Sequence, residues 1–466
     1  MGKRNTEIRW PERIAYGLGG MTLAATAGMN QYFIMYMTNV AFLDIAIIST
    51  ILAVSRVFDG ISDILVGNLV DNTNTIHGKA RIWIRRMCLP AGLTMILMFY
   101  VPSSWPEGIR YVYVFLIYNL FTTVFTTFTN IAHFSLLPLM TDDQREYRRI
   151  ASVVGTLQKV GEMLVSAFII KLLMVFTSEP GNPLTQKAFT CAITILAIVF
   201  VACFLIEFAF TRERIHNNAR ETDTAHGSDK TGVFSELRFL FSDKYWIIFF
   251  SMTFITLLST IISSVPISYY TLYVLNDLEA MTWINLVMGI TGIATSIVMV
   301  FIGPKMSSRL ILVTGAIFVI VGRTGLGIVG NGNQSILMAW FAVAGIGQAL
   351  VPIGLAVLTP EVILYSQKKK GKLVPGVGSA VFNTAKKLAM GLATVIFGFL
   401  MSSAGFDATL DAQGIAQPAS VTTAIMMGFS WLPVTMLFVA ILLVVFFFDL
   451  DKANREMDDT LQNPGI

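Results

Sequence analysis

Long apolar runs separated by short polar segments dominate the chain. A helix that crosses about 30 Å of hydrocarbon needs roughly 20 mostly apolar residues, and twelve stretches of this sequence meet that requirement. The pattern predicts an all-α membrane protein with twelve transmembrane helices in two six-helix bundles. The predicted spans are residues 14–41, 46–70, 83–102, 111–139, 151–176, 188–210, 245–275, 282–303, 310–329, 335–364, 377–404 and 420–448.

The longest polar stretch divides these spans into six and six. It predicts an N-terminal bundle at 1–210, a cytoplasmic linker at 211–244, a C-terminal bundle at 245–448 and a cytoplasmic tail at 449–466. A glycine followed by a short basic turn closes both the second and the eighth span, at Gly67 and at Gly303. This weak echo is expected if the two bundles are related by an internal repeat.

Composition and charge support the same fold class. The 466 residues are 55% hydrophobic and 13% charged, whereas soluble domains carry about 25% charged residues. Of the 33 Lys and Arg residues, 25 fall in the tails and loops of one side and only Arg110 and Lys187 in the loops of the other. Because basic loops stay in the cytoplasm, both termini are predicted to be cytoplasmic. The basic character therefore reflects orientation in the lipid bilayer and does not indicate a nucleic-acid partner.

The sequence contains no recognisable catalytic motif. Its three cysteines lie in apolar stretches, and we find no paired Cys/His spacing, no phosphate-binding glycine loop and no nucleophile triad. We therefore expect no enzymatic activity and no cofactor other than a coupling ion.

Ionised side chains in the second span are the most informative feature. An ionised group at the bilayer centre costs a few kcal/mol on insertion scales, yet Arg56, Asp59 and Asp63 lie within eight residues. Asp59 and Asp63 are one helical turn apart and share a face. One interpretation is a buried structural network in which Arg56 neutralises one carboxylate. The other is a cation site, in which Asp59 and Asp63 bind a proton or act as the metal ligands of sodium.

Polar side chains in the first and fourth spans are candidates for a solute or cation site. In span four, Asn130 and His133 form a polar stripe with Thr127 one turn earlier; His133 is equally well interpreted as a neutral residue bonded to a neighbouring helix. In span one, Asn30 and Gln31 offer donors and acceptors suited to sugar hydroxyls, or to hydrogen bonds between helices.

Two later spans carry cations. Lys159 lies in span five, and span eleven contains Asn383 and, four residues later on the same face, Lys387. The ammonium group of Lys387 is a natural partner for the carboxylates of span two. Glu207, near the predicted end of span six, is interpreted as a cap on the central linker.

The second span carries a resemblance to a known family. The segment Arg56-Val-Phe-Asp59-Gly-Ile-Ser-Asp63, followed by Gly67, Asp71 and Gly78-Lys79-Ala-Arg81, resembles the signature of the glycoside-pentoside-hexuronide:cation symporters of the major facilitator superfamily. Weaker likenesses extend over nearly the whole chain. The resemblance implies that the coupling sodium or proton is bound at positions matching Asp59, Asp63 and Thr127, with Lys387 close by.

The sugar-binding pattern of that family is less faithfully matched. By the resemblance, a fourth-helix acid falls on Asn130 and the aromatic residue after it on Phe134, and Lys159 is the cation nearest to a fifth-helix arginine. The site predicted here has fewer carboxylates than the family pattern and retains Lys159. We therefore expect an anionic or less polar glycoside. The predicted substrate-binding set is Asn30, Gln31, Arg56, Asn130, His133, Phe134, Lys159 and Asn383.

These observations predict a symporter, with two alternatives left open. We expect cation-coupled transport of a small glycoside, pentoside or hexuronide by alternating access, in a bacterial inner membrane. Gly67, Asp71, Lys79 and Arg81 are the predicted cytoplasmic gate. The alternatives are a carrier of lysolipid or another amphipathic solute, which should show an apolar cavity, and an uncoupled facilitator whose carboxylates are structural.

Overall fold

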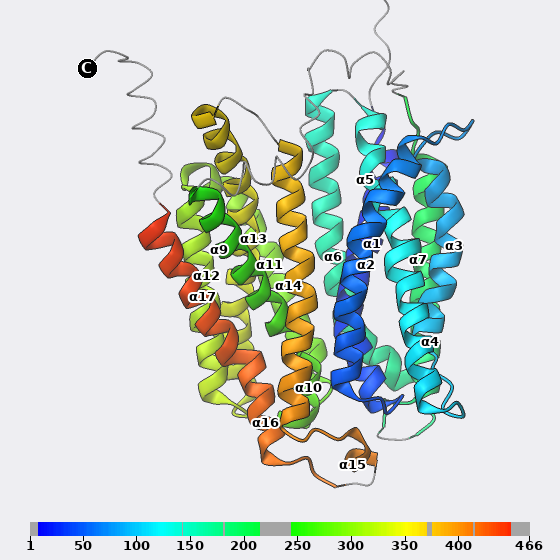
Figure 1. Ribbon diagram of the computed structural model, residues 1–466, viewed down its shortest axis with the longest axis vertical. Helices are drawn as coiled ribbons and strands as arrows, with labels where there is room; N and C mark the ends of the chain where they lie inside the picture. Colours follow the sequence, from blue (N-terminus) through cyan, green and yellow to red (C-terminus); the bar gives the residue numbers. More distant parts are fainter. Residues whose placement is uncertain are drawn as a thin grey trace, which may run out of the picture. The chain divides into compact units, whose positions relative to one another are not determined.

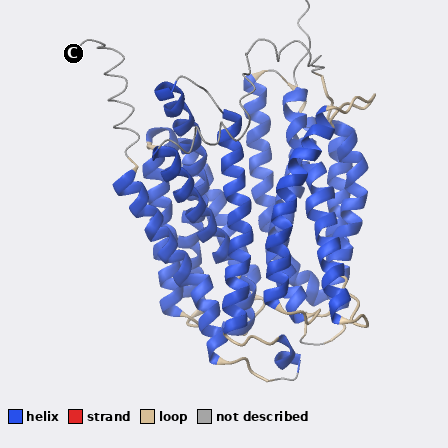
Figure 2. Cartoon of the chain, viewed as in Figure 1, coloured by secondary structure: helices blue, strands red, loops and turns tan. Residues whose placement is uncertain are grey.

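The computed structural model describes residues 8–141, 143–179, 182–214, 244–370, 375–412 and 415–448. Over these ranges the chain forms helices and no sheet (Figure 2). The helices before the central polar stretch are α1 (Trp10–Asn39), α2 (Ile45–Asp71), α3 (Arg81–Met98), α4 (Glu107–Asn119), η1 (Leu120–Thr126), α5 (Thr127–Met140), α6 (Gln144–Phe176) and α7 (Gln186–Phe210). Those after it are α9 (Lys244–Ser264), α10 (Ile267–Tyr269), η2 (Tyr270–Val274), α11 (Ala280–Ile302), η3 (Gly303–Lys305), α12 (Ser308–Val329), α13 (Gln334–Lys370), α14 (Pro375–Ser403), α15 (Ala408–Ala412), α16 (Ala419–Met426), η4 (Met427–Trp431), α17 (Leu432–Leu442) and η5 (Leu443–Phe447).

The helices follow the apolar pattern, with shifted ends. In the described part of the chain, nine helical stretches are long and apolar enough to cross a membrane, which agrees with the predicted all-helical membrane fold; the count of twelve stays a prediction. Most of the predicted linker at 211–244 and the whole tail at 449–466 lie outside the described residues. The domain boundaries at residues 210 and 245 therefore also stay predictions.

Local chemistry explains where several helices begin and end. The side chain of Asp44 accepts hydrogen bonds from the N–H groups of Ala46 and Ile47 at 2.9 and 3.0 Å, which caps the start of α2. Helix α9 ends at Ser264, directly before Val265-Pro266, because proline lacks the N–H that would continue the ladder. Helix α13 continues to Lys370, six residues beyond the predicted end of its span at 364.

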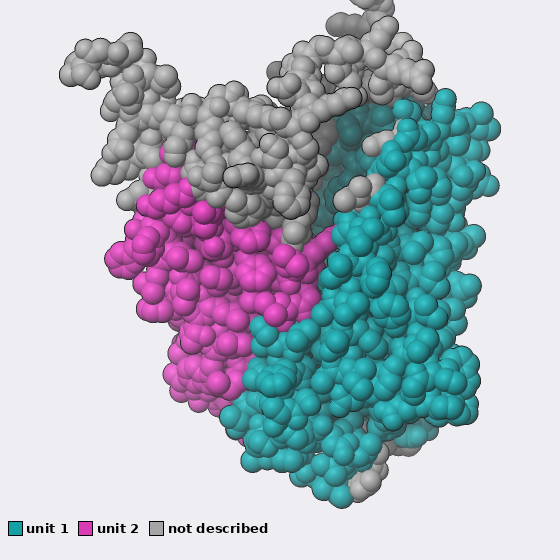
Figure 3. Space-filling model, viewed as in Figure 1, with its two compact units in different colours: residues 1–217, 265–289, 394–425 teal, residues 218–264, 290–393, 426–466 magenta. Residues whose placement is uncertain are grey.

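The chain divides into two compact units, shown in teal and magenta in Figure 3. The first comprises the described residues of 1–217, 265–289 and 394–425, and the second those of 218–264, 290–393 and 426–466. Helices α11 and α14 contribute residues to both units.

Glycines bring α1 and α6 together in the first unit, where the two helices run side by side (Figure 1). A Cβ atom at Gly28 would lie 3.1 Å from the main-chain oxygen of Glu162, and one at Gly161 would lie 2.6 Å from that of Met21. Small residues at such positions let two helix backbones approach closely inside a membrane. The packing of α1 against α6 and α7 therefore positions the polar side chains of this unit.

The second unit uses the same device between α12 and α13. A Cβ atom at Gly322 would lie 2.6 Å from the main-chain nitrogen of Ala344, and one at Gly347 would lie 2.5 Å from the oxygen of Gly315. Helix α17 packs against α9 and α12. An apolar cluster that includes Trp246, Leu355 and Val444 fills the interior at one end of these helices.

Candidate functional site

The candidate site is built around Asp59, in the middle of an apolar helix. Asp59 is the fifteenth of the 27 residues of α2, and its residue surface is only 6% exposed. A carboxylate at this depth needs a cation or hydrogen-bond donors around it.

Two side chains donate hydrogen bonds to the Asp59 carboxylate, one from α2 and one from η1. Arg56 donates from Nη1 to Oδ2 of Asp59 at 2.9 Å, and Thr123 donates from Oγ1 to Oδ1 at 2.5 Å. The other terminal nitrogen of Arg56 donates to the hydroxyl of Tyr118 at 2.6 Å. Both carboxylate oxygens of Asp59 therefore accept a hydrogen bond from a side chain, one from a permanent cation and one from a hydroxyl.

The wide π-helical turn η1 brings Thr123 to this carboxylate. The segment Leu120–Thr126 interrupts the α-helical ladder between α4 and α5, and such π-bulges occur frequently at functional sites. The hydroxyl of Ser62 on α2 also donates to the main-chain oxygen of Thr123. Thr127, the residue expected from the resemblance, donates instead to the main-chain oxygen of Thr122 at 3.1 Å.

Asp63 lies one turn after Asp59 and differs from it in exposure. Its side chain is half-buried, whereas that of Asp59 is buried. The formal charges of Arg56, Asp59 and Asp63 sum to one negative charge. A single monovalent cation would neutralise such a group, and within the described residues no cluster of three or more His, Cys, Asp or Glu side chains suits a multivalent metal.

The predicted residues of span one are only partly described. The side chain of Asn30 lies outside the described part of the structure. Gln31 keeps its Nε2 atom buried without a hydrogen-bond partner among the described residues, while its main-chain oxygen accepts from Ser268 at 3.3 Å. The side chain of Gln31 also lies beside the hydroxyl of Tyr32.

The predicted stripe on span four divides between two faces of α5. Asn130 and Phe134 are exposed, and Phe134 is 56% exposed. His133 is fully enclosed, and its Nδ1 lies 2.6 Å from Oε1 of Glu207 on α7. This contact corresponds to the alternative in which His133 bonds to a neighbouring helix. It also corrects the interpretation of Glu207 as a cap on the central linker. The main-chain oxygen of Glu207 accepts a hydrogen bond from the hydroxyl of Thr211 at the end of α7, but its carboxylate is buried inside the first unit.

The remaining predicted cations lie on α6 and α14. Lys159 is exposed on α6 and forms an ion pair of 3.0 Å with Glu162. Lys387 lies in the second unit, where its side chain is half-buried on α14. The side chain of Asn383, on the same helix, lies outside the described part.

The predicted gate segment is held by an acid that sequence reasoning did not single out. The carboxylate of Glu213 accepts hydrogen bonds from the main-chain N–H groups of Lys79, Ala80 and Arg81 at 2.8 to 3.0 Å. A carboxylate is stabilising at a helix N-terminus, here that of α3. Gly78, directly before Lys79, has a φ of +103°, a backbone conformation that favours glycine. Gly67 has open space beside it, and the side chain of Asp71 lies outside the described residues.

Ion pairs join other segments at the same end of this unit. Glu12 in the first turn of α1 pairs with Arg214 at 2.6 Å, and Arg13 pairs with Glu146 of α6 at 2.6 Å. The hydrogen bond to Glu12 raises the pKa of Arg214, whereas burial lowers the pKa of Arg81. Four segments that the sequence predicts to be cytoplasmic are thus linked to one another.

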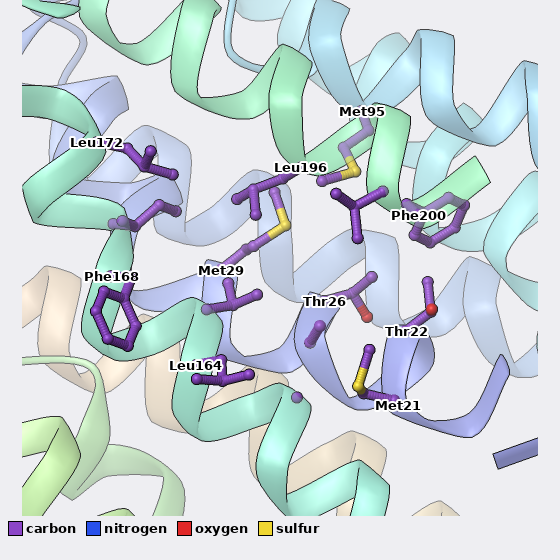
Figure 4. Close-up of a pocket in the computed structure, with 15 residues that line it drawn as sticks. Met21, Thr22, Thr26, Met29, Met95, Leu164, Phe168, Leu172, Leu196 and Phe200 are labelled. Atoms are coloured by element: carbon purple, nitrogen blue, oxygen red, sulfur yellow. The ribbon is translucent and has the colours of Figure 1, made fainter. Parts of the chain in front are cut away.

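A separate apolar cavity of about 320 Å³ lies between α1, α6 and α7 of the first unit, with Met95 contributed by α3 (Figure 4). Hydrocarbon and sulfur atoms of Met21, Met29 and Phe168 face it (Figure 4). Its two hydroxyls, those of Thr22 and Thr26, donate to main-chain oxygens of their own helix. The cavity therefore suits an apolar group rather than a sugar.

Comparison with known proteins agrees with the resemblance seen in the second span. Residues 15–452 match the family described as MFS/sugar transport protein. The glucuronide carrier protein homolog of Escherichia coli K12 is 24% identical over 464 residues, which cover 98% of this chain and 97% of that protein. The isoprimeverose transporter of Lactiplantibacillus pentosus is 23% identical over 457 residues, 97% of this chain and 91% of that protein.

Solved structures share the fold. The nucleoside transporter NupG, in a point-mutant form, matches with a TM-score of 0.66 at 12% identity, over 93% of this chain and 99% of its own. A D-xylose-proton symporter matches with a TM-score of 0.63 at 13% identity, over 95% of this chain and 98% of its own. These likenesses identify the all-helical major facilitator fold.

Proposed function

Because the chain belongs to the MFS/sugar transport protein family, and is thus a multi-pass membrane transporter and not an enzyme, we propose that it is a cation-coupled symporter for a small glycoside, pentoside or hexuronide. The observation that carries the proposal is Asp59, a buried carboxylate in the middle of α2 between Arg56 and Thr123. Two of its relatives are named as carriers of a glucuronide and of isoprimeverose, which supports a sugar as the solute.

The coupling ion, sodium or a proton, binds beside Asp59 and Asp63. Arg56 offsets the charge of Asp59, and a bound monovalent cation adds a further positive charge beside the two carboxylates. Thr123 supplies a hydroxyl oxygen next to Asp59, a hard ligand of the kind that suits sodium. Thr127 and Lys387 remain the positions expected from the resemblance. By linkage, bound cation raises the affinity for the solute, and the solute raises the affinity for the cation by the same factor.

The solute binds to polar groups of the first unit. Gln31 offers a buried side-chain amide, and Asn130 and Phe134 present an amide and an aromatic ring on the exposed face of α5. Asn30, Arg56 and Lys159 keep the roles predicted from the sequence, as does Asn383 on α14, whereas the enclosed His133 is bonded to Glu207 and is no longer part of the proposed solute site. The charge of Lys159 and the small number of acids favour an anionic glycoside.

The chain crosses the bacterial inner membrane twelve times, with both termini in the cytoplasm. Besides the nine most apolar stretches, α1, α3 and α6 have 30, 18 and 33 residues, and 18 residues already extend about 27 Å. The ion pairs among the first turn of α1, the start of α6 and the segment after α7 support one common side for these segments. Gly67, Asp71, Lys79 and Arg81 act at the cytoplasmic gate during alternating access.

A second candidate is transport of an amphipathic solute such as a lysolipid. The apolar cavity lined by Met21, Met29 and Phe168 favours it, because a hydrocarbon chain would fill that space without leaving polar groups unpaired.

Uptake by the purified full-length protein in proteoliposomes tests these alternatives. The panel contains a glucuronide, isoprimeverose, a neutral galactoside and a lysolipid, each with a sodium gradient, a proton gradient or neither. We expect gradient-driven accumulation of the glucuronide or isoprimeverose. Preference for the neutral galactoside contradicts the proposed solute charge, preference for lysolipid selects the second candidate, and equal uptake without a gradient identifies an uncoupled facilitator.

A further inference from the structure

His133 and Glu207 form a buried pair that the proposed coupling mechanism does not use. The two side chains are completely enclosed, and Nδ1 of His133 lies 2.6 Å from Oε1 of Glu207. Tyr16 on α1 donates its hydroxyl to the main-chain oxygen of His133 at 3.0 Å and stacks on the imidazole with ring centroids 4.2 Å apart. The pair thus connects α1, α5 and α7 within one unit.

Counting protons shows what such a pair holds. With one proton between the imidazole nitrogen and the carboxylate oxygen, the pair is neutral overall, whether the proton lies on histidine or on glutamate. Removing that proton leaves a negative charge, and adding a second leaves a positive one. Each isolated charge is costly in an apolar interior, so the pair is most stable when it holds one proton.

Each partner also has an atom that the pairing leaves unused. Nε2 of His133 and Oε2 of Glu207 are buried and have no hydrogen-bond partner among the described residues. A buried polar atom without a hydrogen-bond partner destabilises the folded protein. A purely structural cross-link would be expected to satisfy both atoms, whereas a group that exchanges a proton keeps a free position.

Two consecutive glycines of α1 make room for these atoms. A Cβ atom at Gly19 would lie 1.8 Å from Oε2 of Glu207, and one at Gly20 would lie 3.3 Å from Nε2 of His133. The bare backbone of α1 therefore lies against both unused atoms.

The other elements packed around the pair bring few titratable groups. Tyr16 faces it from α1, Cys203 lies one turn before Glu207 on α7, and Gln158 of α6 approaches Gly20. At the start of α3, Arg81 donates to the main-chain oxygen of Phe208 and interacts with Glu213, Arg212 and Glu12. On α2, Asp59 lies against Thr123, ten residues and hence about 15 Å along the helix from His133. Among these described groups, His133 is the one whose side chain is hydrogen-bonded to Glu207.

We propose that His133 and Glu207 are a proton-binding site, separate from the cation site of α2, which holds one exchangeable proton between the middle of α5 and the last turn of α7. The location supports exchange with the bath on that side. Glu207 is three residues before the end of α7, and Thr211 after it bonds to its main-chain oxygen. Loss of the proton leaves an uncompensated carboxylate beside α1 and weakens the contact between α5 and α7. The transport rate then acquires a pH dependence that does not come from Asp59 or Asp63.

The test measures the proton on His133 directly, in the full-length protein in lipid nanodiscs. The chain has four histidines, and replacing His77, His216 and His226 by Gln leaves His133 alone for ¹⁵N NMR of the imidazole. We expect the midpoint of its titration to fall by about one unit or more in Glu207→Gln, a tenfold loss of proton affinity, because the carboxylate that stabilises the proton is gone. Cys203→Ala changes packing one turn away without changing charge and should leave the midpoint in place.

A midpoint that moves by less than about half a unit in Glu207→Gln, or that moves equally in Cys203→Ala, overturns the proposal. If Glu207→Gln does not fold, Glu207→Leu, which also removes the carboxylate, is judged by the same criteria. Because the measurement needs no solute and no gradient, its result is independent of whether the protein is a sugar symporter.

Discussion

Two buried carboxylates in the same compact unit, Asp59 on α2 and Glu207 on α7, are held in different ways. Asp59 accepts from a permanently charged guanidinium and from a hydroxyl, and half-buried Asp63 lies one turn away. Glu207 is completely enclosed with an imidazole, whose charge depends on a proton. The two acids are thus both buried but have different partners, and we propose that the partner decides whether a carboxylate stays charged and attracts an external cation or shares a proton internally.

We expect the largest loss of stability when the imidazole beside the enclosed Glu207 is removed. His133→Ala leaves Glu207 without its partner in a space closed to water, and breaking a buried pair in this way costs about 3–5 kcal/mol. Thermal unfolding in detergent at neutral pH measures the loss. The double variant His133→Ala/Glu207→Leu should recover most of it, because no polar group then remains unpaired; a double variant as unstable as the single one contradicts the pairing argument.

The next largest effect is expected on transport. Asp59→Asn removes the charge that binds the coupling ion, and gradient-driven accumulation of the solute should fall by about 100-fold, at the upper end of ordinary coupling free energies. Uptake in proteoliposomes checks it. Leu65→Ala is the matched control, since Leu65 is on the same helix and 60% exposed. Accumulation that survives in Asp59→Asn would remove the coupling role from this residue.

A smaller effect distinguishes two neighbouring threonines. Thr123→Ala removes a hydrogen bond to a charged group, worth about 1.5–3 kcal/mol, and should weaken the apparent affinity for the coupling ion by about tenfold or more. Thr127→Ala removes a bond to a main-chain oxygen of its own helix and should change that affinity by less than about threefold. Ion-dependent uptake kinetics measure both, and the reverse order would favour the position expected from the family resemblance.

The smallest effect is expected where a carboxylate lies outside the apolar layer. Glu213→Gln keeps an oxygen acceptor at the start of α3 but loses the negative charge, which is worth about 0.3–1 kcal/mol at a helix N-terminus. Thermal unfolding at low and high salt measures it, and the difference from the parent protein should shrink as salt increases. A loss of stability as large as that of His133→Ala would contradict the explanation that solvent and the helix dipole are the main stabilisers of Glu213.

Sequence reasoning located these features to different degrees. Asp59 could be found because an ionised residue in a long apolar run has a cost that composition reveals. The partner of His133 could not be chosen, since Glu207 is 74 residues away in sequence and only the packing of α5 against α7 brings the two side chains together. The apolar pattern likewise predicted the helices but not the π-helical segments that interrupt them. It gave no indication that Glu213 caps the start of α3.

The choice between Thr123 and Thr127 has a structural origin in η1. A π-turn is what an α-helix forms when it accommodates one additional residue, so α4 and α5 keep their own packing on either side of the widened turn. A homologue lacking that insertion would carry an alignment gap somewhere within 120–126 while its two flanking helices superpose without displacement. Residue correspondences drawn across this segment to such a homologue would be offset by an amount that depends on where the gap is put. The residues that follow Thr126 should therefore be aligned with those of relatives separately from the residues before Leu120.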